Sequence, residues 1–156
     1  MKKHKLLPYI VFILLSLAVG GAGALAVMRG LPAYMALEKP PLTPPAIVFP
    51  IVWSVLYVLM GVGAARVWLS RSRFRSRALA AYGFQLVLNV LWVVWFFGLG
   101  ARLLAFWWLL ALQGAVVLMI WTFFRVDRPA GLLQLPYLLW CVFAAYLNLG
   151  VWLLNR

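Results

Sequence analysis

The side chains that could carry chemistry in this chain are mostly aromatic rings and amides. There are nine tryptophans, whereas the acids are Glu38 and Asp127 alone, the one histidine is His4 and the one cysteine is Cys141. These counts exclude a disulfide framework and a Cys/His zinc site, so we predict no metal. A paired-carboxylate acid–base site is also excluded, because the two acids belong to different loops.

Three stretches place rings and polar groups on one helical face, because positions three, four, seven or eleven residues apart align along a helix. The faces are Trp53, Tyr57 and Met60 or Gly61; Gln85, Asn89, Trp92 and Phe96; and Tyr137, Trp140, Ala144 and Asn148. Rings beside a few polar anchors are typical of ligand pockets. The alternative is that these residues only join helices, since amides hydrogen-bond across membrane helices.

The elements that must position these faces are long apolar runs. Of the 156 residues, 67% are hydrophobic and 10% are charged, whereas a soluble domain carries roughly a quarter charged residues. A spanning helix takes about 20 residues, and five such runs cover residues 6–28, 46–69, 79–99, 103–124 and 130–154. We therefore predict an all-α membrane protein, with residues 1–156 forming one bundle of five transmembrane helices.

The first run follows a basic start, as a signal peptide does, but its length of about 22 residues favours a retained helix. Basic residues then set the orientation. Lys2, Lys3, Lys5, Arg66, Arg71, Arg73, Arg75, Arg77, Arg125 and Arg128 lie on one side, and Arg29, Lys39, Arg102 and Arg156 lie on the other. The positive-inside rule places the N-terminus in the cytoplasm, and we expect a bacterial inner membrane.

The basic loop at residues 71–77 is the one candidate for contact with nucleic acid. A short loop between spans is better explained as a topology signal that touches anionic lipid. We therefore expect membrane lipid, and no nucleic acid, as a partner.

A proline-rich segment separates the first two spans, with Pro40, Pro41, Pro44 and Pro45 inside six residues. This segment cannot be helical and favours extended polyproline II. Trp53, Asn89, Trp92, Ala144 and Asn148 all lie roughly 9 to 15 Å from the span ends on this side, at 1.5 Å per residue. The loop is therefore either a lid over a pocket shared by three helices or a rigid spacer.

Taken together, these motifs resemble the tryptophan-rich sensory protein family (TspO/MBR), which includes the translocator protein, also called the peripheral benzodiazepine receptor. The resemblance covers all five spans. It rests on Lys39-Pro-Pro-Leu-Thr-Pro-Pro45, Phe49-Pro50, Trp53, Leu56-Tyr57, Gln85-Leu-Val-Leu-Asn89, Trp92, Phe96-Phe97, Pro136-Tyr137, Trp140, Ala144 and Leu147-Asn148.

The resemblance implies a homodimer with a pocket beneath the first loop for protoporphyrin IX or a related tetrapyrrole, and no cofactor. Residue by residue, it implies ligand contacts at Tyr34, Lys39, Pro44, Phe49, Trp53, Tyr57, Gln85, Asn89, Trp92, Phe96, Trp140, Ala144, Leu147 and Asn148. Lys39 would pair with a propionate of the ligand. The expected function is a membrane-embedded, tetrapyrrole-binding sensor or regulator.

Two other functions stay open under the same resemblance. One is facilitated transport of porphyrin or another lipophile. The other is light-dependent porphyrin degradation, in which Trp53 and Trp140 would be the redox-active residues.

The sequence also departs from the family. Leu42 stands where many members have tryptophan, which removes one expected contact of the loop. The cholesterol motif of animal relatives needs a basic residue soon after tyrosine, but Tyr146 is followed by none until Arg156. Cholesterol binding through this motif is therefore not expected.

Overall fold

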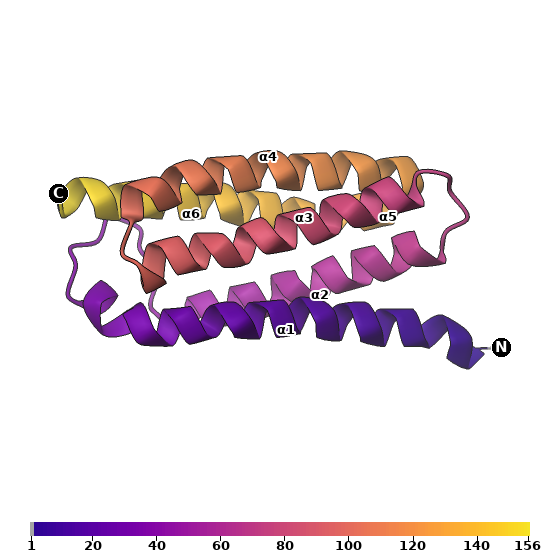
Figure 1. Ribbon diagram of the computed structural model, residues 1–156, viewed down its shortest axis with the longest axis horizontal. Coiled ribbons are helices and arrows are strands. Elements are labelled where there is room, and N and C mark those ends of the chain that lie inside the picture. Colours follow the sequence, from indigo (N-terminus) through magenta and orange to yellow (C-terminus); the bar gives the residue numbers. More distant parts are fainter. Residues whose placement is uncertain (1) are drawn as a thin grey trace.

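The computed structural model describes residues 2–156, with side chains from residue 5 onward, so the side chains of Lys2, Lys3 and His4 lie outside the described part. The chain is a set of helices that run roughly along one axis (Figure 1). The elements are α1 (Lys2–Met35), α2 (Val48–Leu69), α3 (Arg75–Val93), the π-helical η1 (Val94–Gly98), α4 (Arg102–Val126), α5 (Arg128–Leu132) and α6 (Leu135–Leu154).

Five helical segments are long and apolar enough to cross a membrane, which confirms the prediction of an all-α membrane bundle. Several boundaries differ from the expected ones, including the start of the third span, which lies at Arg75 rather than at residue 79. The first helix continues past residue 28 to Met35, and Gly30 of this added part packs against the Phe97 carbonyl of η1. The last span is divided into α5 and α6 by a turn at Leu133 and Gln134, and Pro136 lies in the first turn of α6, where proline is well tolerated.

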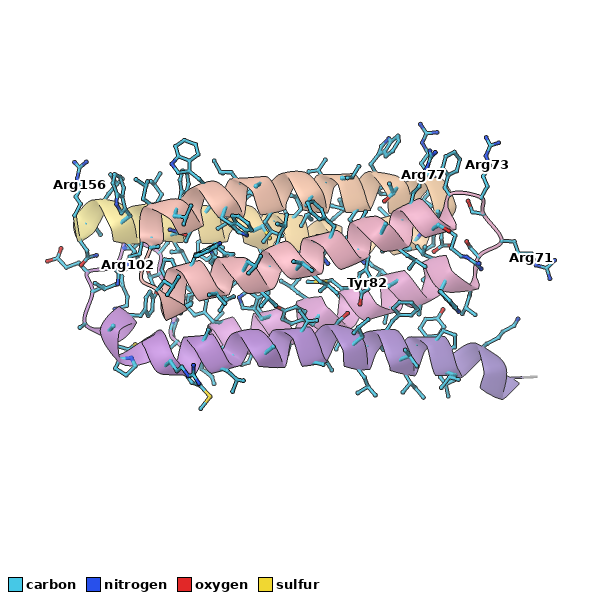
Figure 2. All side chains as sticks on the ribbon, in the orientation of Figure 1. Arg71, Arg73, Arg77, Tyr82, Arg102 and Arg156 are labelled. Atoms are coloured by element: carbon cyan, nitrogen blue, oxygen red, sulfur yellow. The ribbon has the colours of Figure 1, made fainter. Side chains whose placement is uncertain are left out.

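The helices pack in a definite order. α1 lies along α2 and also contacts α3 and η1, while α4 lies against α3 and α6. In Figure 1, α3 accordingly runs between α4 and the α1–α2 pair. The side chain of Tyr82 points from α3 toward α1 (Figure 2), where its hydroxyl lies 2.6 Å from Ser16 Oγ.

The backbones of α1 and α2 approach each other closely at Gly61. A Cβ atom at this position would lie 2.5 Å from the Cα of Ile13, which is closer than any real Cβ contact. Glycine is therefore the residue that allows the two backbones to meet, as small residues do between membrane helices.

The proline-rich loop, residues 36–47, lies against α6 rather than standing free. Tyr146 Oη donates a hydrogen bond to the Pro41 carbonyl at 2.6 Å. The Asn155 side chain accepts from the Glu38 amide at 3.0 Å and donates to the Glu38 carbonyl at 2.8 Å. The loop is thus attached to the C-terminal half of α6 by side-chain-to-backbone hydrogen bonds.

The prediction of an extended polyproline segment is wrong at the centre of this loop. Leu42 has a φ of 69°, and Thr43 Oγ1 donates to the Pro40 carbonyl at 2.7 Å. Proline followed by a residue with positive φ is the arrangement of a type II turn, so Pro41 and Leu42 reverse the chain. The hydrogen bonds of the loop to α6 stabilise this turn despite the unfavourable φ of a leucine.

Candidate functional site

Trp53 lies at the centre of a cluster of aromatic rings near the loop end of the bundle. Its ring centroid is 5.8 Å from Tyr57, 6.0 Å from Trp92 and 6.1 Å from Tyr137. These separations fall in the range of favourable aromatic pairs. The three faces predicted from the sequence therefore meet at one level, with rings contributed by α2, α3 and α6.

The aromatic row continues from this cluster to the end of α1. Phe96 lies 6.1 Å from Trp92, and Tyr34 lies 5.9 Å from Phe96, measured between ring centroids. Phe96 belongs to η1, so the π-helical turn helps to set the direction of this ring relative to α3. π-Helical turns occur frequently at functional sites. We define the rings of Tyr34, Trp53, Tyr57, Trp92, Phe96 and Tyr137 as the aromatic row.

Two buried amides connect the hydroxyl groups of the row. Tyr57 Oη donates to Asn89 Oδ1 at 2.5 Å, and Asn89 Nδ2 donates to Tyr137 Oη at 2.9 Å. Tyr137 Oη then donates to Gln85 Oε1 at 2.8 Å. Buried polar groups are usually paired in this way. Asn89 and Gln85 therefore do join α2, α3 and α6, whatever further role they have toward a ligand.

Trp92 and Asn148 form a second polar connection. Trp92 Nε1 donates to Asn148 Oδ1 at 3.1 Å, and Asn148 Nδ2 donates to the Arg102 carbonyl at 2.8 Å. This pair links α3, α6 and the start of α4, and it fixes the plane of the Trp92 indole within the row.

Trp140 differs from the other predicted ligand residues, because its Nε1 is buried but has no hydrogen-bond partner within residues 2–156. A buried indole N–H normally has a partner. Trp140 also lies 6.0 Å from Phe49 between ring centroids. It is one wall of a groove of about 430 Å³ between α2 and α6, lined by Ile51, Val52, Val55, Leu56, Leu59, Pro136, Leu139, Trp140 and Phe143.

The remaining predicted residues lie at the same end of the molecule. Ala144 and Leu147 are buried on α6, and Pro44 is half-buried in the loop. Lys39 Nζ lies 5.0 Å from the centroid of the Tyr34 ring and donates to the Met35 and Leu37 carbonyls at 3.2 and 3.0 Å. The lysine that sequence reasoning assigned to a propionate thus also binds the end of α1.

Sequence reasoning missed two features of this end of the bundle. Tyr146 and Asn155 hold the loop, but nothing in their spacing signals a partner more than a hundred positions away. Arg29 and Arg102 line a second cavity of about 290 Å³. A signal for them was present, since each is a cation that interrupts an otherwise apolar stretch.

At the opposite end, Asp127 has a structural partner. Its carboxylate accepts hydrogen bonds from Arg66 Nε at 2.6 Å and from Nη2 at 3.2 Å, and both side chains are partly exposed. Since the same carboxylate caps α5, Asp127 connects α2 with α5 and has no place in the aromatic row.

The sequence of this chain is similar to those of known membrane proteins over most of its length. The model of the TspO/MBR family matches residues 12–153. The chain is 37% identical over 148 residues to the tryptophan-rich protein TspO of Chlorobaculum tepidum, which covers 90% of this chain and 91% of that protein. It is 38% identical over 122 residues to the tryptophan-rich sensory protein of Cereibacter sphaeroides, covering 78% and 76%.

The translocator protein of Homo sapiens is 36% identical over 127 residues, covering 80% of this chain and 75% of that protein. The family model's match over residues 12–153 includes the proline-rich loop and all three faces that build the aromatic row. This five-span membrane protein therefore belongs to the TspO/MBR family.

Proposed function

We propose that this protein is a membrane-embedded sensor or regulator that binds protoporphyrin IX or a related tetrapyrrole. The observation that carries the proposal is the aromatic row beneath the loop, with Trp53 within 5.8 to 6.1 Å of three other rings. Flat, polarizable rings suit a flat macrocycle. The names of two relatives, tryptophan-rich sensory protein and translocator protein, agree with a sensory or ligand-handling role.

The groove beside Trp140 supports the same proposal. Its volume of about 430 Å³ lies within the usual range for small-molecule sites, about 300 to 1,000 Å³. Ile51, Val55 and Leu139 are exposed along it, so a lipophilic ligand reaches Trp140 from the bilayer between α2 and α6. The free Nε1 of Trp140 then donates a hydrogen bond to an acceptor on the ligand.

A sensor also needs a part that responds to the ligand. The loop at residues 36–47 lies at the end of the row that carries Tyr34 and is held to α6 by a small set of hydrogen bonds. Ligand contacts at Tyr34, Lys39 and Pro44 would shift the equilibrium between a loop that is hydrogen-bonded to α6 and a loop that is released from it.

We further propose that the protein acts as a homodimer in a bacterial inner membrane.

The test is quenching of tryptophan fluorescence by protoporphyrin IX in detergent-purified protein. We expect saturable quenching, with affinity weakened about tenfold or more in Trp53→Ala, because the central ring of the row is lost. Trp107→Ala is the matched control, since Trp107 is exposed on α4. Equal affinities of Trp53→Ala and wild type, with the helices intact by circular dichroism, would contradict the proposal.

Facilitated transport is the second candidate, and the groove favours it because it opens on the outer surface of the bundle. Flux of porphyrin across sealed liposomes containing the protein distinguishes transport from binding alone. A flux no faster than that of protein-free liposomes would exclude transport.

Light-dependent porphyrin degradation is the third candidate. Trp53 is an oxidisable indole 6.0 Å from a second indole, Trp92, between ring centroids, and Trp140 lies on the groove. Illumination of the complex should then give new absorbing products that are lost in Trp53→Phe. Products that persist in this variant would remove Trp53 from the reaction.

A further inference from the structure

A second cavity lies between α1 and the segment that joins α3 to α4. Its volume is about 290 Å³, and its walls include Arg29, Tyr34, Phe96, Phe97 and Arg102. Figure 2 places Arg102 at the loop end of the bundle, far from the basic loop that carries Arg71 and Arg73. We define this space as the arginine cavity.

Neither arginine of the cavity forms an ion pair within residues 2–156, where the one salt bridge joins Arg66 and Asp127 at the opposite end. Arg102 Nε is buried and lacks a hydrogen-bond partner among the described residues. Of the two acids, Asp127 is paired with Arg66, and Glu38 is exposed in the loop. A guanidinium has five N–H donors and no acceptor, so a buried, unpaired N–H calls for an anionic or carbonyl acceptor.

The arginine cavity borders the aromatic row, because Tyr34 and Phe96 belong to both. The Tyr34 centroid lies 5.9 Å from that of Phe96 and 5.4 Å from that of Phe97. Phe96 in turn lies 6.1 Å from Trp92. A molecule whose apolar body lies on the row would therefore have a short anionic arm next to the cavity that Arg29 and Arg102 line.

We infer that the arginine cavity binds a carboxylate of the ligand whose macrocycle lies on the aromatic row, an inference that rests on the proposed function. Arginine is suited to this task because its planar fork matches the two oxygens of a carboxylate. A volume of about 290 Å³ suits a carboxyalkyl arm rather than the macrocycle itself. Lys39, by contrast, already donates to two backbone carbonyls.

The consequence is selectivity for acidic porphyrins over neutral ones. Charge-assisted hydrogen bonds are stronger than neutral ones. We therefore expect wild type to bind protoporphyrin IX about tenfold or more tightly than its dimethyl ester, which has the same macrocycle without carboxylates. The ratio of the affinities for protoporphyrin IX and for its dimethyl ester, rather than either affinity alone, reports on the arginine cavity.

The experiment measures quenching by both porphyrins in wild type, Arg102→Gln, Arg29→Gln and the double variant. Each single substitution should reduce the preference severalfold by weakening diacid binding while leaving ester binding unchanged, and the double variant should abolish it. Arg102→Lys, which keeps the positive charge, should retain part of the preference. Arg156→Gln is the matched control, because this exposed arginine at the same end lies over the Trp152 ring.

Different failures have different meanings. Saturable binding of both porphyrins with no preference in wild type, or with a preference that survives in the double variant, overturns the inference and leaves the porphyrin site standing. No saturable binding of either porphyrin overturns the proposed function and the inference together.

A lipid phosphate is the other source of an anionic group. It is tested by thermal unfolding in nanodiscs of phosphatidylcholine with and without phosphatidylglycerol. Stabilisation by phosphatidylglycerol that requires Arg29 and Arg102, without any preference for the diacid porphyrin, would overturn the inference and assign the cavity to lipid.

Discussion

At the scale of single residues, the two indoles Trp92 and Trp140 have opposite roles. Both are deep tryptophans on predicted pocket faces. Trp92 Nε1 donates to Asn148, so that indole is part of the internal hydrogen bonding of the bundle. Trp140 Nε1 is buried without a partner in the described part of the chain, so its N–H remains for a ligand. The same residue type therefore stabilises the fold at one position, and under the proposed function it donates to a ligand at the other.

A matched pair of variants tests this difference. Trp92→Phe should destabilise the protein by about 1–3 kcal/mol, because it leaves the Asn148 carboxamide oxygen without a donor. Trp140→Phe should leave stability nearly unchanged but weaken porphyrin binding, since it removes a donor that has no internal partner. Thermal unfolding in detergent and fluorescence titration measure the two effects. A large loss of stability in Trp140→Phe would mean that its Nε1 is satisfied within the protein.

At the scale of elements, two glycines that allow close backbone packing and one aspartate that binds two elements decide where the helices and the loop lie. Gly61 lets α1 meet α2, and Gly150 lets the loop meet α6, since a Cβ there would lie 2.6 Å from Pro40. Asp127 ends α4 and begins α5 while binding Arg66 of α2. These contacts fix the positions of α1, α5 and the loop, while the hydrogen bonds of Asn89 and Gln85 join the three faces of the aromatic row.

Gly61→Ala should separate α1 from α2, because the new methyl group meets the backbone of Ile13 and no flexible side chain can move aside. We expect a destabilisation of about 1–3 kcal/mol, seen as a lower unfolding temperature. Gly21→Ala is the control, since its Cβ would have no described atom within 4 Å, and this change should be neutral or slightly stabilising. Equal stability of the two variants would contradict the close packing of α1 on α2.

The attachment of the loop can be tested separately. Tyr146→Phe together with Asn155→Ala removes three hydrogen bonds between the loop and α6. Amide hydrogen exchange at residues 36–47 should become faster, while exchange in α3 and α4 stays the same. Unchanged exchange in the loop would show that packing of Pro40 on Gly150 holds it without these bonds.

At the scale of the whole molecule, an apolar surface that faces lipid surrounds a mainly hydrophobic core with a few buried polar side chains, and the two ends of the bundle differ in charge. Leu14, Val87, Trp107 and Leu139 are exposed on the sides of the helices, as a membrane protein requires. Figure 2 places Arg71, Arg73 and Arg77 at one end and Arg102 and Arg156 at the other. The basic loop therefore lies at the end opposite the loop that borders the proposed ligand site.

This asymmetry predicts the orientation of the protein. With the N-terminus in the cytoplasm, a cysteine introduced as Leu42→Cys should react in intact cells with a thiol reagent that cannot cross the membrane. Ser72→Cys should react only after the membrane is opened. The native Cys141 is buried and gives little background. The reverse pattern would place the proline-rich loop in the cytoplasm.

The sequence by itself determined the class of fold, the five spans and the residues of the three faces. Hydrophobic length and helical periodicity are local properties, so they are visible without knowing which helices are neighbours. They also placed Trp53, Trp92 and Tyr137 on inward faces, and the structure brings these rings together.

Only the tertiary structure decided how these residues are used. It paired Asn89 with Tyr57 and Tyr137, left the Trp140 N–H without an acceptor among the described residues, and brought Arg29 and Arg102 to one cavity. It also bent the loop at Leu42 and attached it to Tyr146. Each of these contacts depends on which helices are neighbours and on how each helix is rotated and placed in depth. The spacing of side chains along one helix carries no information about those relations between helices.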